Sequence, residues 1–376
     1  MRDRARAFLC YDDEVGPDAG ALIEAVEVVL PCERLDETAA FFVDALGFRV
    51  VAVRPADDPI VVVVEGHGAR LRLTRGLGGD PGALRLLCRD PAAFGELVAP
   101  NGTRIELVDA DPPVVLPPLQ PAFVVSRKAQ ARWVTGRAGM RYRDLIPGRQ
   151  GGRFVASHIE IPDGGPVPDY VHYHRVRFQL IYCCRGWVRL VYEDQGPPFL
   201  LRAGDCVLQP PRIRHRVLES SPGLEVIEVG CPADHETLVD HALELPTAST
   251  RPERRFDGQR FVRHQASRAL WGTWRLAGFA CRDLGIAAAT GGIASACVVR
   301  PRGNVSDLAC RHDAELLLLV VLDGAITLQH EAGDDRRLEA GDAVVIPAGL
   351  QHALTRPDGH LELLEVAVPG GFSTRW

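Results

Sequence analysis

An internal repeat limits the folds open to this chain more than any other feature of its sequence. Residues 123–152 are echoed by residues 261–292 at an offset of 138 to 140 residues. The correspondence continues through the following segments as far as His215 and His352, with only small insertions. A period of this length exceeds any solenoid unit, so it predicts two copies of one complete domain.

Both copies have the pattern of β-structure. Short runs rich in Val, Ile and Leu alternate with turn residues, and the 37 glycines and 28 prolines of the 376 residues exceed the usual share. Such strands are typical of a sandwich or a closed barrel. Five prolines within residues 107–121 predict a stiff linker that ends a preceding domain. The expected division is a first domain at 1–112, a linker at 113–122, copies at 123–232 and 259–376, and a connector at 233–258.

The connector has a helical pattern around residues 236–245, followed by a polar stretch. The sequence therefore predicts a short helix and then an exposed segment that joins the two copies. Its two histidines, His235 and His241, are interpreted as surface residues and not as ligands.

Composition and charge exclude several classes of protein. Hydrophobic residues at 46% and charged residues at 24% match folded globular proteins. The net charge of −6 is spread along the chain and offers no basic face to nucleic acid. No apolar run approaches the roughly 18–20 residues of a membrane helix, and no signal-peptide hydrophobic region follows Met1. We therefore expect a cytoplasmic protein with neither nucleic-acid nor membrane partners.

Two histidines two residues apart carry the strongest chemical signal. His172 and His174 end an extended stretch, where alternate side chains point to the same face, so both imidazoles can meet one metal. Gln179 then opens the next apolar strand. A glycine turn, another strand and a proline corner lead to His215.

This pattern resembles the cupin superfamily, whose first motif is HxH, three or four residues, Glu, six residues and Gly. Its second motif is Gly, five residues, PxG, two residues and His. The first copy matches at His172, His174, Gln179, Gly186, Gly204, Pro210 and His215. It departs from the family at Gln179, where Glu is usual, and at Arg212, where the second motif has Gly.

The resemblance implies a jelly-roll barrel that holds one divalent metal per chain on His172, His174, Gln179 and His215. Iron is preferred, and manganese, nickel or zinc also suit these ligands. Because an amide oxygen carries no charge, the metal would be a stronger Lewis acid than on a glutamate. Tyr170, Arg177 and Arg212 flank the ligands and are candidates for orienting an anionic substrate. The alternative is that these histidines belong to an inactive barrel.

The second copy retains less of the motif. His312 and His352 match ligand histidines, but Cys310 takes the first-histidine position and Leu317 takes the Glu position. One interpretation is a zinc or copper site on Cys310, His312 and His352, since thiolate binds both metals well. The other is a degenerate barrel kept for packing. Loss of the fourth ligand favours degeneracy, because leucine cannot bind a metal.

The first domain has a different pattern. Strands are expected at 26–30, 48–53, 60–65 and 70–74, with a helix at 35–46, which gives a βαβββ unit followed by an abbreviated second unit. This unit resembles the vicinal oxygen chelate (glyoxalase/bleomycin-resistance) superfamily. Glu106 falls at that family's late Glu ligand, but Ala25 and Val26 stand where the early histidine belongs. The resemblance therefore implies docking or dimerisation, with a homodimer as the default, and not a complete metal site.

The expected fold is thus mainly β: two cupin (jelly-roll) barrels preceded by a small α+β, glyoxalase-like domain. The resemblance implies a metal-dependent bicupin enzyme with its chemistry in the first barrel. The preferred function is an Fe(II)-type dioxygenase acting on a small oxygenated organic molecule. One alternative is a metal-dependent isomerase, lyase or epimerase of a sugar acid or oxo-acid, and the other is a non-catalytic module that binds a small ligand.

Overall fold

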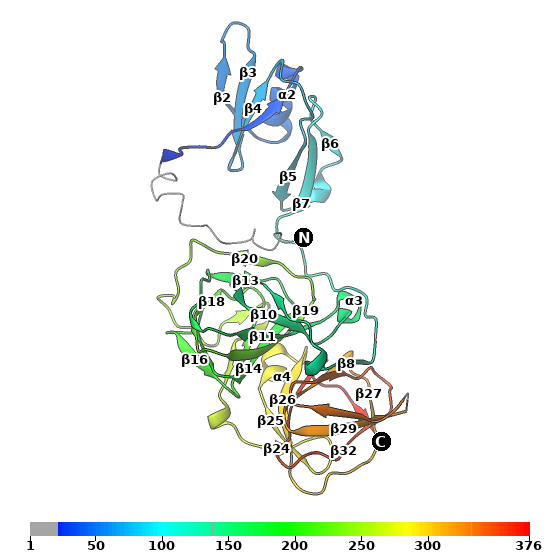
Figure 1. The fold of residues 1–376 in the computed structure, drawn as a ribbon. Coiled ribbons are helices and arrows are strands. Elements are labelled where there is room, and N and C mark those ends of the chain that lie inside the picture. Colours follow the sequence, from blue (N-terminus) through cyan, green and yellow to red (C-terminus); the bar gives the residue numbers. More distant parts are fainter. Residues whose placement is uncertain (1–21, 137–138, 332) are drawn as a thin grey trace. The chain divides into compact units, whose positions relative to one another are not determined.

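The fold is that of a computed structural model, described over residues 22–136, 139–331 and 333–376 (Figure 1). Residues 1–21, which include the start of the chain where no signal peptide is expected, and Ala138 of the repeat lie outside the described residues. The chain is mainly β and divides into two compact units, Met1–Pro113 and Val114–Trp376. No described helix has the length and apolar character to span a membrane.

The first unit has the expected βαβββ order. A four-stranded sheet runs β1-β4-β3-β2, with β1 parallel to β4, and a second sheet runs β5-β7-β6. The predicted helix is shorter than expected and continues as a wider π-type turn, η1. The elements are β1 (Val28–Pro31), α2 (Leu35–Ala40), η1 (Phe41–Ala45), β2 (Arg49–Arg54), β3 (Val61–Gly66), β4 (Ala69–Thr74), β5 (Ala83–Cys88), η2 (Pro91–Ala93), β6 (Leu97–Val98) and β7 (Arg104–Asp109).

The first barrel consists of two sheets. The larger runs β23-β17-β14-β19-β11-β10-β9, and the smaller runs β16-β15-β18-β13-β20, with β12 beside β18. The larger sheet contains β9 (Val134–Thr135), β10 (Arg141–Asp144), β11 (Val155–Ile161), β14 (Phe178–Arg185), β17 (Cys206–Gln209), β19 (Leu224–Cys231) and β23 (Val262–His264). The smaller contains β12 (Gly165–Pro166), β13 (His172–His174), β15 (Trp187–Tyr192), β16 (Phe199–Arg202), β18 (His215–Ser220) and β20 (Thr237–Val239). The short segments η3 (Lys128–Gln130) and α3 (Arg149–Gly152) precede β11.

The second barrel repeats this plan. Its large sheet runs β24-β25-β26-β33-β28-β31-β8, and smaller sheets run β30-β29-β32 and β27-β34. The large sheet contains β8 (Val124–Ser126), β24 (Gly272–Thr273), β25 (Phe279–Asp283), β26 (Ser295–Pro301), β28 (Leu316–Asp323), β31 (Ala343–Val345) and β33 (Glu362–Val368). The other elements are β21 (Arg255–Phe256), β22 (Gln259–Arg260), η5 (Ala266–Arg268), α4 (Ile286–Thr290), β27 (Arg311–His312), β29 (Ala325–His330), β30 (Arg336–Glu339), β32 (His352–Thr355) and β34 (Thr374–Arg375).

One hydrophobic core joins the two barrels. Fully buried side chains of the first barrel, such as Phe178 and Leu180, share a cluster with Leu316 and Val366 of the second. Each large sheet therefore has one face toward its own barrel interior and the other toward the partner barrel. This arrangement explains why strands such as β28 are apolar at nearly every position instead of alternating.

The two barrels also exchange their first strands. β8, which opens the first sequence copy, pairs with β31 of the second barrel. β23, which opens the second copy, pairs with β17 of the first barrel. The copies defined by the repeat and the sheets defined by pairing therefore differ by one strand each. Neither barrel has a complete large sheet without the other copy's strand.

Two buried arginines, Arg143 and Arg282, reinforce this exchange at equivalent positions. Arg143, which is 1% exposed, donates from Nη2 to the carbonyl oxygen of Gly341 at 2.6 Å. Arg282, which is 4% exposed, donates from Nη1 to the carbonyl oxygen of Gly204 at 2.8 Å. Each arginine thus satisfies a carbonyl group in the turn of the opposite barrel. A buried backbone carbonyl needs such a partner.

The aspartates of the repeated Gly-Asp pairs fix the segments that follow the exchanged strands. Asp342 accepts hydrogen bonds from the backbone N–H of Lys128 at 2.8 Å and from Nη1 of Arg127 at 2.7 Å. Asp205 accepts the equivalent backbone hydrogen bond from Ala266 at 2.8 Å. Both carboxylates are buried, so these charge-assisted bonds are stronger than exposed ones.

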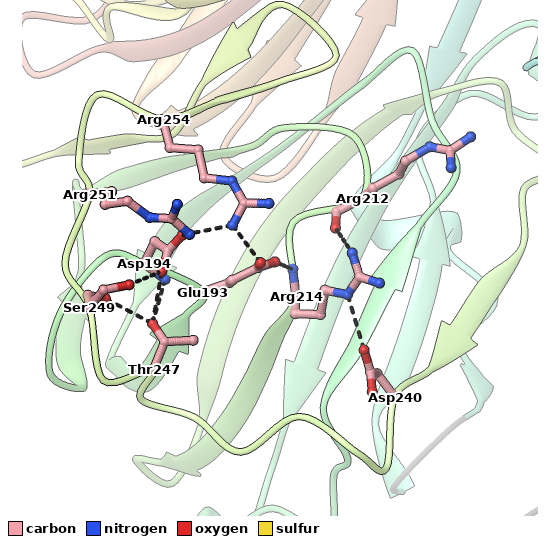
Figure 2. A network of polar contacts seen from close by, with 9 residues as sticks. All are labelled: Glu193, Asp194, Arg212, Arg214, Asp240, Thr247, Ser249, Arg251 and Arg254. Atoms are coloured by element: carbon pink, nitrogen blue, oxygen red, sulfur yellow. Dashed lines mark hydrogen bonds and ion pairs between the residues drawn. The ribbon is translucent and has the colours of Figure 1, made fainter.

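The connector differs from the prediction. The helix expected around residues 236–245 is absent, and strand β20 pairs with β13 in its place. Beyond β20 the chain is held by Asp194, whose side chain is 1% exposed (Figure 2). Burial raises the pKa of Asp194, but hydrogen bonds outweigh this effect and hold the pKa below its usual value. The donors to its carboxylate are Thr247, Ser249, Arg251 and Arg254.

We predict that Asp342→Ala lowers the free energy of unfolding by about 3 kcal/mol. The substitution leaves hydrogen-bond donors without an acceptor at the point where the two barrels exchange strands. Urea denaturation followed by circular dichroism measures this change. The control is Asp335→Ala, which removes an exposed ion pair with Arg356 and should cost less than about 1 kcal/mol. Equal losses in the two variants would contradict the role given to Asp342.

Candidate metal centre

The first barrel encloses a cavity of about 300 Å³. Most of its wall is apolar and comes from both sheets, and its polar groups include the histidines of β13 and β18 and Gln179 of β14. The apolar lining residues are Met140, Ile159, Ile161, Ile181, Val188, Leu190, Val217, Leu224 and Val226. The polar ones are Tyr142, His172, His174, Gln179, Gln209, His215, Glu228, His235 and Thr237.

Three of the predicted ligands meet in this cavity. His172 and His174 lie at the two ends of β13, and His215 opens β18, directly opposite His172 in the ladder. One ring nitrogen from each histidine lies within 4.8 Å of the other two. Nitrogens bound to one ion at about 2.1 Å are at most about 4.2 Å apart, so this spacing is close to that of a ligand set.

Hydrogen bonds to the outer ring nitrogens orient the imidazoles. Nδ1 of His172 lies 2.8 Å from the carbonyl oxygen of Tyr170, and Nδ1 of His215 lies 3.0 Å from that of Ile213. A carbonyl only accepts, so each Nδ1 carries the proton and each Nε2 keeps its lone pair. Nδ1 of His174 lies 3.0 Å from the hydroxyl of Thr237 on β20. This is the arrangement of metal-binding histidines.

Gln179 supplies the fourth polar group. It is 2% exposed, and its Nε2 donates to Oε1 of Glu228 on the neighbouring strand β19. That bond fixes the amide, and Oε1 of Gln179 has no hydrogen-bond partner among the described residues. A buried amide oxygen without a partner is costly unless something else binds it. The residues of this site therefore fit a divalent metal held by three imidazoles and one amide oxygen.

The three predicted substrate-orienting residues do not line the cavity within the described part of the chain. Tyr170 is 38% exposed, and its ring packs against His241. The backbone of Arg177 bonds to Cys231 and Gln259. The guanidinium of Arg212 pairs with Asp257 at 3.4 Å, and its carbonyl accepts from Arg214 (Figure 2). Their role toward a substrate stays a prediction.

Sequence reasoning missed the polar groups that come from outside the motifs. His235 and Thr237 belong to the connector, and the pairing of β20 with β13 brings them beside His174. Glu228 lies on β19, far from the motifs in sequence. The repeat carried a signal for it, because Glu365 occupies the corresponding place on β33 of the second barrel.

The second predicted set is built differently. Sγ of Cys310 lies 3.7 Å from Nε2 of His352, whose Nδ1 faces the carbonyl oxygen of Leu350. Nδ1 of His312 accepts a hydrogen bond from the backbone N–H of Ala314, so the neutral ring carries its proton on Nε2. Burial lowers the pKa of His312 to about 4. The ring nitrogen that faces inward in the first barrel is therefore a donor at His312.

Side chains also fill the interior of the second barrel. Leu317 is fully buried where the first barrel has Gln179, and it packs in a cluster with Trp274 and Phe279. Glu365 is 5% exposed and forms an ion pair with Arg275 at 2.6 Å. Nε1 of Trp274 donates to the same carboxylate at 3.3 Å. These contacts occupy the space that is open in the first barrel.

Comparison with known proteins agrees with this architecture. A model of the cupin domain matches residues 297–367, within the second barrel, whereas no curated protein matches the chain. Salicylate 1,2-dioxygenase from Pseudaminobacter salicylatoxidans superimposes with a TM-score of 0.50 at 15% identity, over 69% of this chain and 90% of that chain. The chain has the bicupin fold. This comparison concerns the fold alone.

Two further bicupin structures are similar. Oxalate decarboxylase from Lactobacillus farciminis has a TM-score of 0.49 at 15% identity, over 69% of this chain and 91% of that chain. Oxalate decarboxylase from Bacillus subtilis has a TM-score of 0.47 at 13% identity, over 70% of this chain and 79% of that chain.

We predict that Gln179→Leu, which gives the first barrel of this bicupin the residue of the second, weakens metal binding at least tenfold. The reason is the loss of the one ligand that is not an imidazole. Competition with a chromogenic chelator measures the affinity. Gln209→Leu is the matched control, because Gln209 is a buried glutamine that faces Gln179 across the ladder and lines the same cavity. Equal weakening in both variants would argue against Gln179 as a ligand.

Proposed function

We propose that this bicupin is a metal-dependent enzyme whose reaction takes place in the first barrel. The observation that carries the proposal is the convergence of three oriented histidines in a cavity that Gln179, whose buried amide oxygen has no hydrogen-bond partner among the described residues, also lines. Within this class we propose an Fe(II)-dependent dioxygenase that acts on a small oxygenated organic molecule. Iron suits a set of imidazoles with one oxygen ligand.

The polar and the apolar residues of the cavity would have different roles in this reaction. His172, His174, His215 and Gln179 would hold the metal, which would supply open coordination positions and electrons for reaction with dioxygen. Because all four ligands are neutral, the metal would stay a stronger Lewis acid toward the oxygen atoms of the substrate than a carboxylate-bound ion. The apolar wall would exclude water and position the body of the substrate.

A non-oxidative enzyme is the second candidate, with the metal as a Lewis acid only. The substrates expected for such an enzyme are sugar acids and oxo-acids. The apolar wall argues against them, since it would leave their polar groups without hydrogen bonds. The non-catalytic alternative, a small-ligand-binding module, would use the same cavity without turnover. Oxygen consumption in the presence of a bound ligand separates the three.

The test is metal analysis of protein purified without a histidine tag. We expect about one iron-group metal per chain in the wild type, its loss in His174→Ala, and its retention in His312→Ala. His312 is the matched control, because it occupies the equivalent place in the second barrel, where its inward nitrogen carries a proton. Metal absent from the wild type even after addition of Fe, Mn, Ni or Zn would refute the proposal. Loss in His312→Ala alone would move the site to the second barrel.

A further inference from the structure

The walls and charges of the first-barrel cavity define the class of molecule that it takes. We propose that the ligand is uncharged and largely apolar, of one or two rings in size, with two neighbouring oxygen atoms that reach the metal. This inference rests on the proposed function, because it takes the metal as bound at the histidines. It departs from the expectation that Arg177 and Arg212 hold an anionic substrate.

The lining gives the apolar character. Eight aliphatic side chains from five different strands surround the cavity, together with Met140, which directly precedes β10. Contact with such a wall favours apolar surface and disfavours polar groups without partners. A cavity of 150 Å³ is enough for benzene, so about 300 Å³ accommodates one or two small rings.

Two carboxylates next to the ligand set supply the charge argument. Glu228 lines the cavity and accepts from Gln179, and Oδ1 of Asp169, 6% exposed, lies 3.5 Å from Nδ1 of His172. With neutral imidazoles and a neutral amide, these two negative charges balance one divalent ion. A neutral ligand keeps the site balanced, whereas a carboxylate adds a negative charge in a place of low dielectric.

Within the described part of the chain, no arginine or lysine lines the cavity to offset that added charge. Two arginines close to the ligand histidines in sequence have acidic partners of their own. Arg175 pairs with Glu236 at 2.9 Å, and Arg212 pairs with Asp257 at 3.4 Å. The charges of these two arginines are thus paired outside the cavity.

The experiment compares two probes of one shape on the full chain loaded with Zn²⁺, which is redox-inert. 2′-Hydroxyacetophenone and salicylate share a ring, an ortho hydroxyl and a carbonyl, but only salicylate has a carboxylate. We expect calorimetry to show binding of 2′-hydroxyacetophenone at least tenfold tighter than that of salicylate. Glu228→Gln should reduce this preference at least threefold, because it removes one negative charge and keeps a hydrogen-bonding side chain beside Gln179.

Glu219→Gln is the matched control, because Glu219 on β18 is a carboxylate of the same barrel that pairs with Arg189 and does not line the cavity, and it should leave the preference unchanged. Equal or tighter binding of salicylate by the wild type, or binding of neither probe, would overturn the inference. The comparison of probes on the wild type holds even if a variant fails to fold. Zinc content measured on the same sample distinguishes the two failures, since an empty site refutes the proposed function and a loaded site without preference refutes the inference alone.

Discussion

The exchange of first strands between the barrels is the constraint on which the rest of the second unit depends. Each large sheet is completed by a strand that belongs in sequence to the other copy, and the buried Arg143 and Arg282 bind carbonyls across the same boundary. Removing either barrel would expose an unpaired strand edge, a buried guanidinium and half of a shared core. The two copies therefore form one structural unit, although the repeat makes them look separable.

This dependence explains how the two interiors can differ so much. The second barrel has to supply a sheet face, a strand and a pair of polar contacts to the first, and none of these uses its interior. Its ligand positions are therefore free to change, as Leu317 and the proton on Nε2 of His312 illustrate. A filled interior also stabilises the barrel, because its packed apolar side chains make van der Waals contacts that an open cavity lacks.

The sequence predicts those features that depend on local patterns. Strand periodicity and the order of the motifs were enough to bring His172, His174 and His215 together, because each histidine lies at a strand end next to its motif. The strand exchange could not be predicted, since a strand of three residues such as β23 carries too little pattern to choose between the edges of the two barrels. The connector was wrongly expected to be helical, because its pairing with β13 and the contacts of Asp194 are tertiary.

The interiors of the two barrels differ in the side chains that contact one equivalent glutamate. Glu228 and Glu365 occupy equivalent positions on β19 and β33, so the repeat places an acid inside each barrel. In the second barrel Arg275 and Trp274 satisfy Glu365 and close the space around it. In the first, the partner is the amide of Gln179, and the cavity beside it stays open. The same acid thus completes the packing of one barrel and fixes the amide of Gln179 in the other.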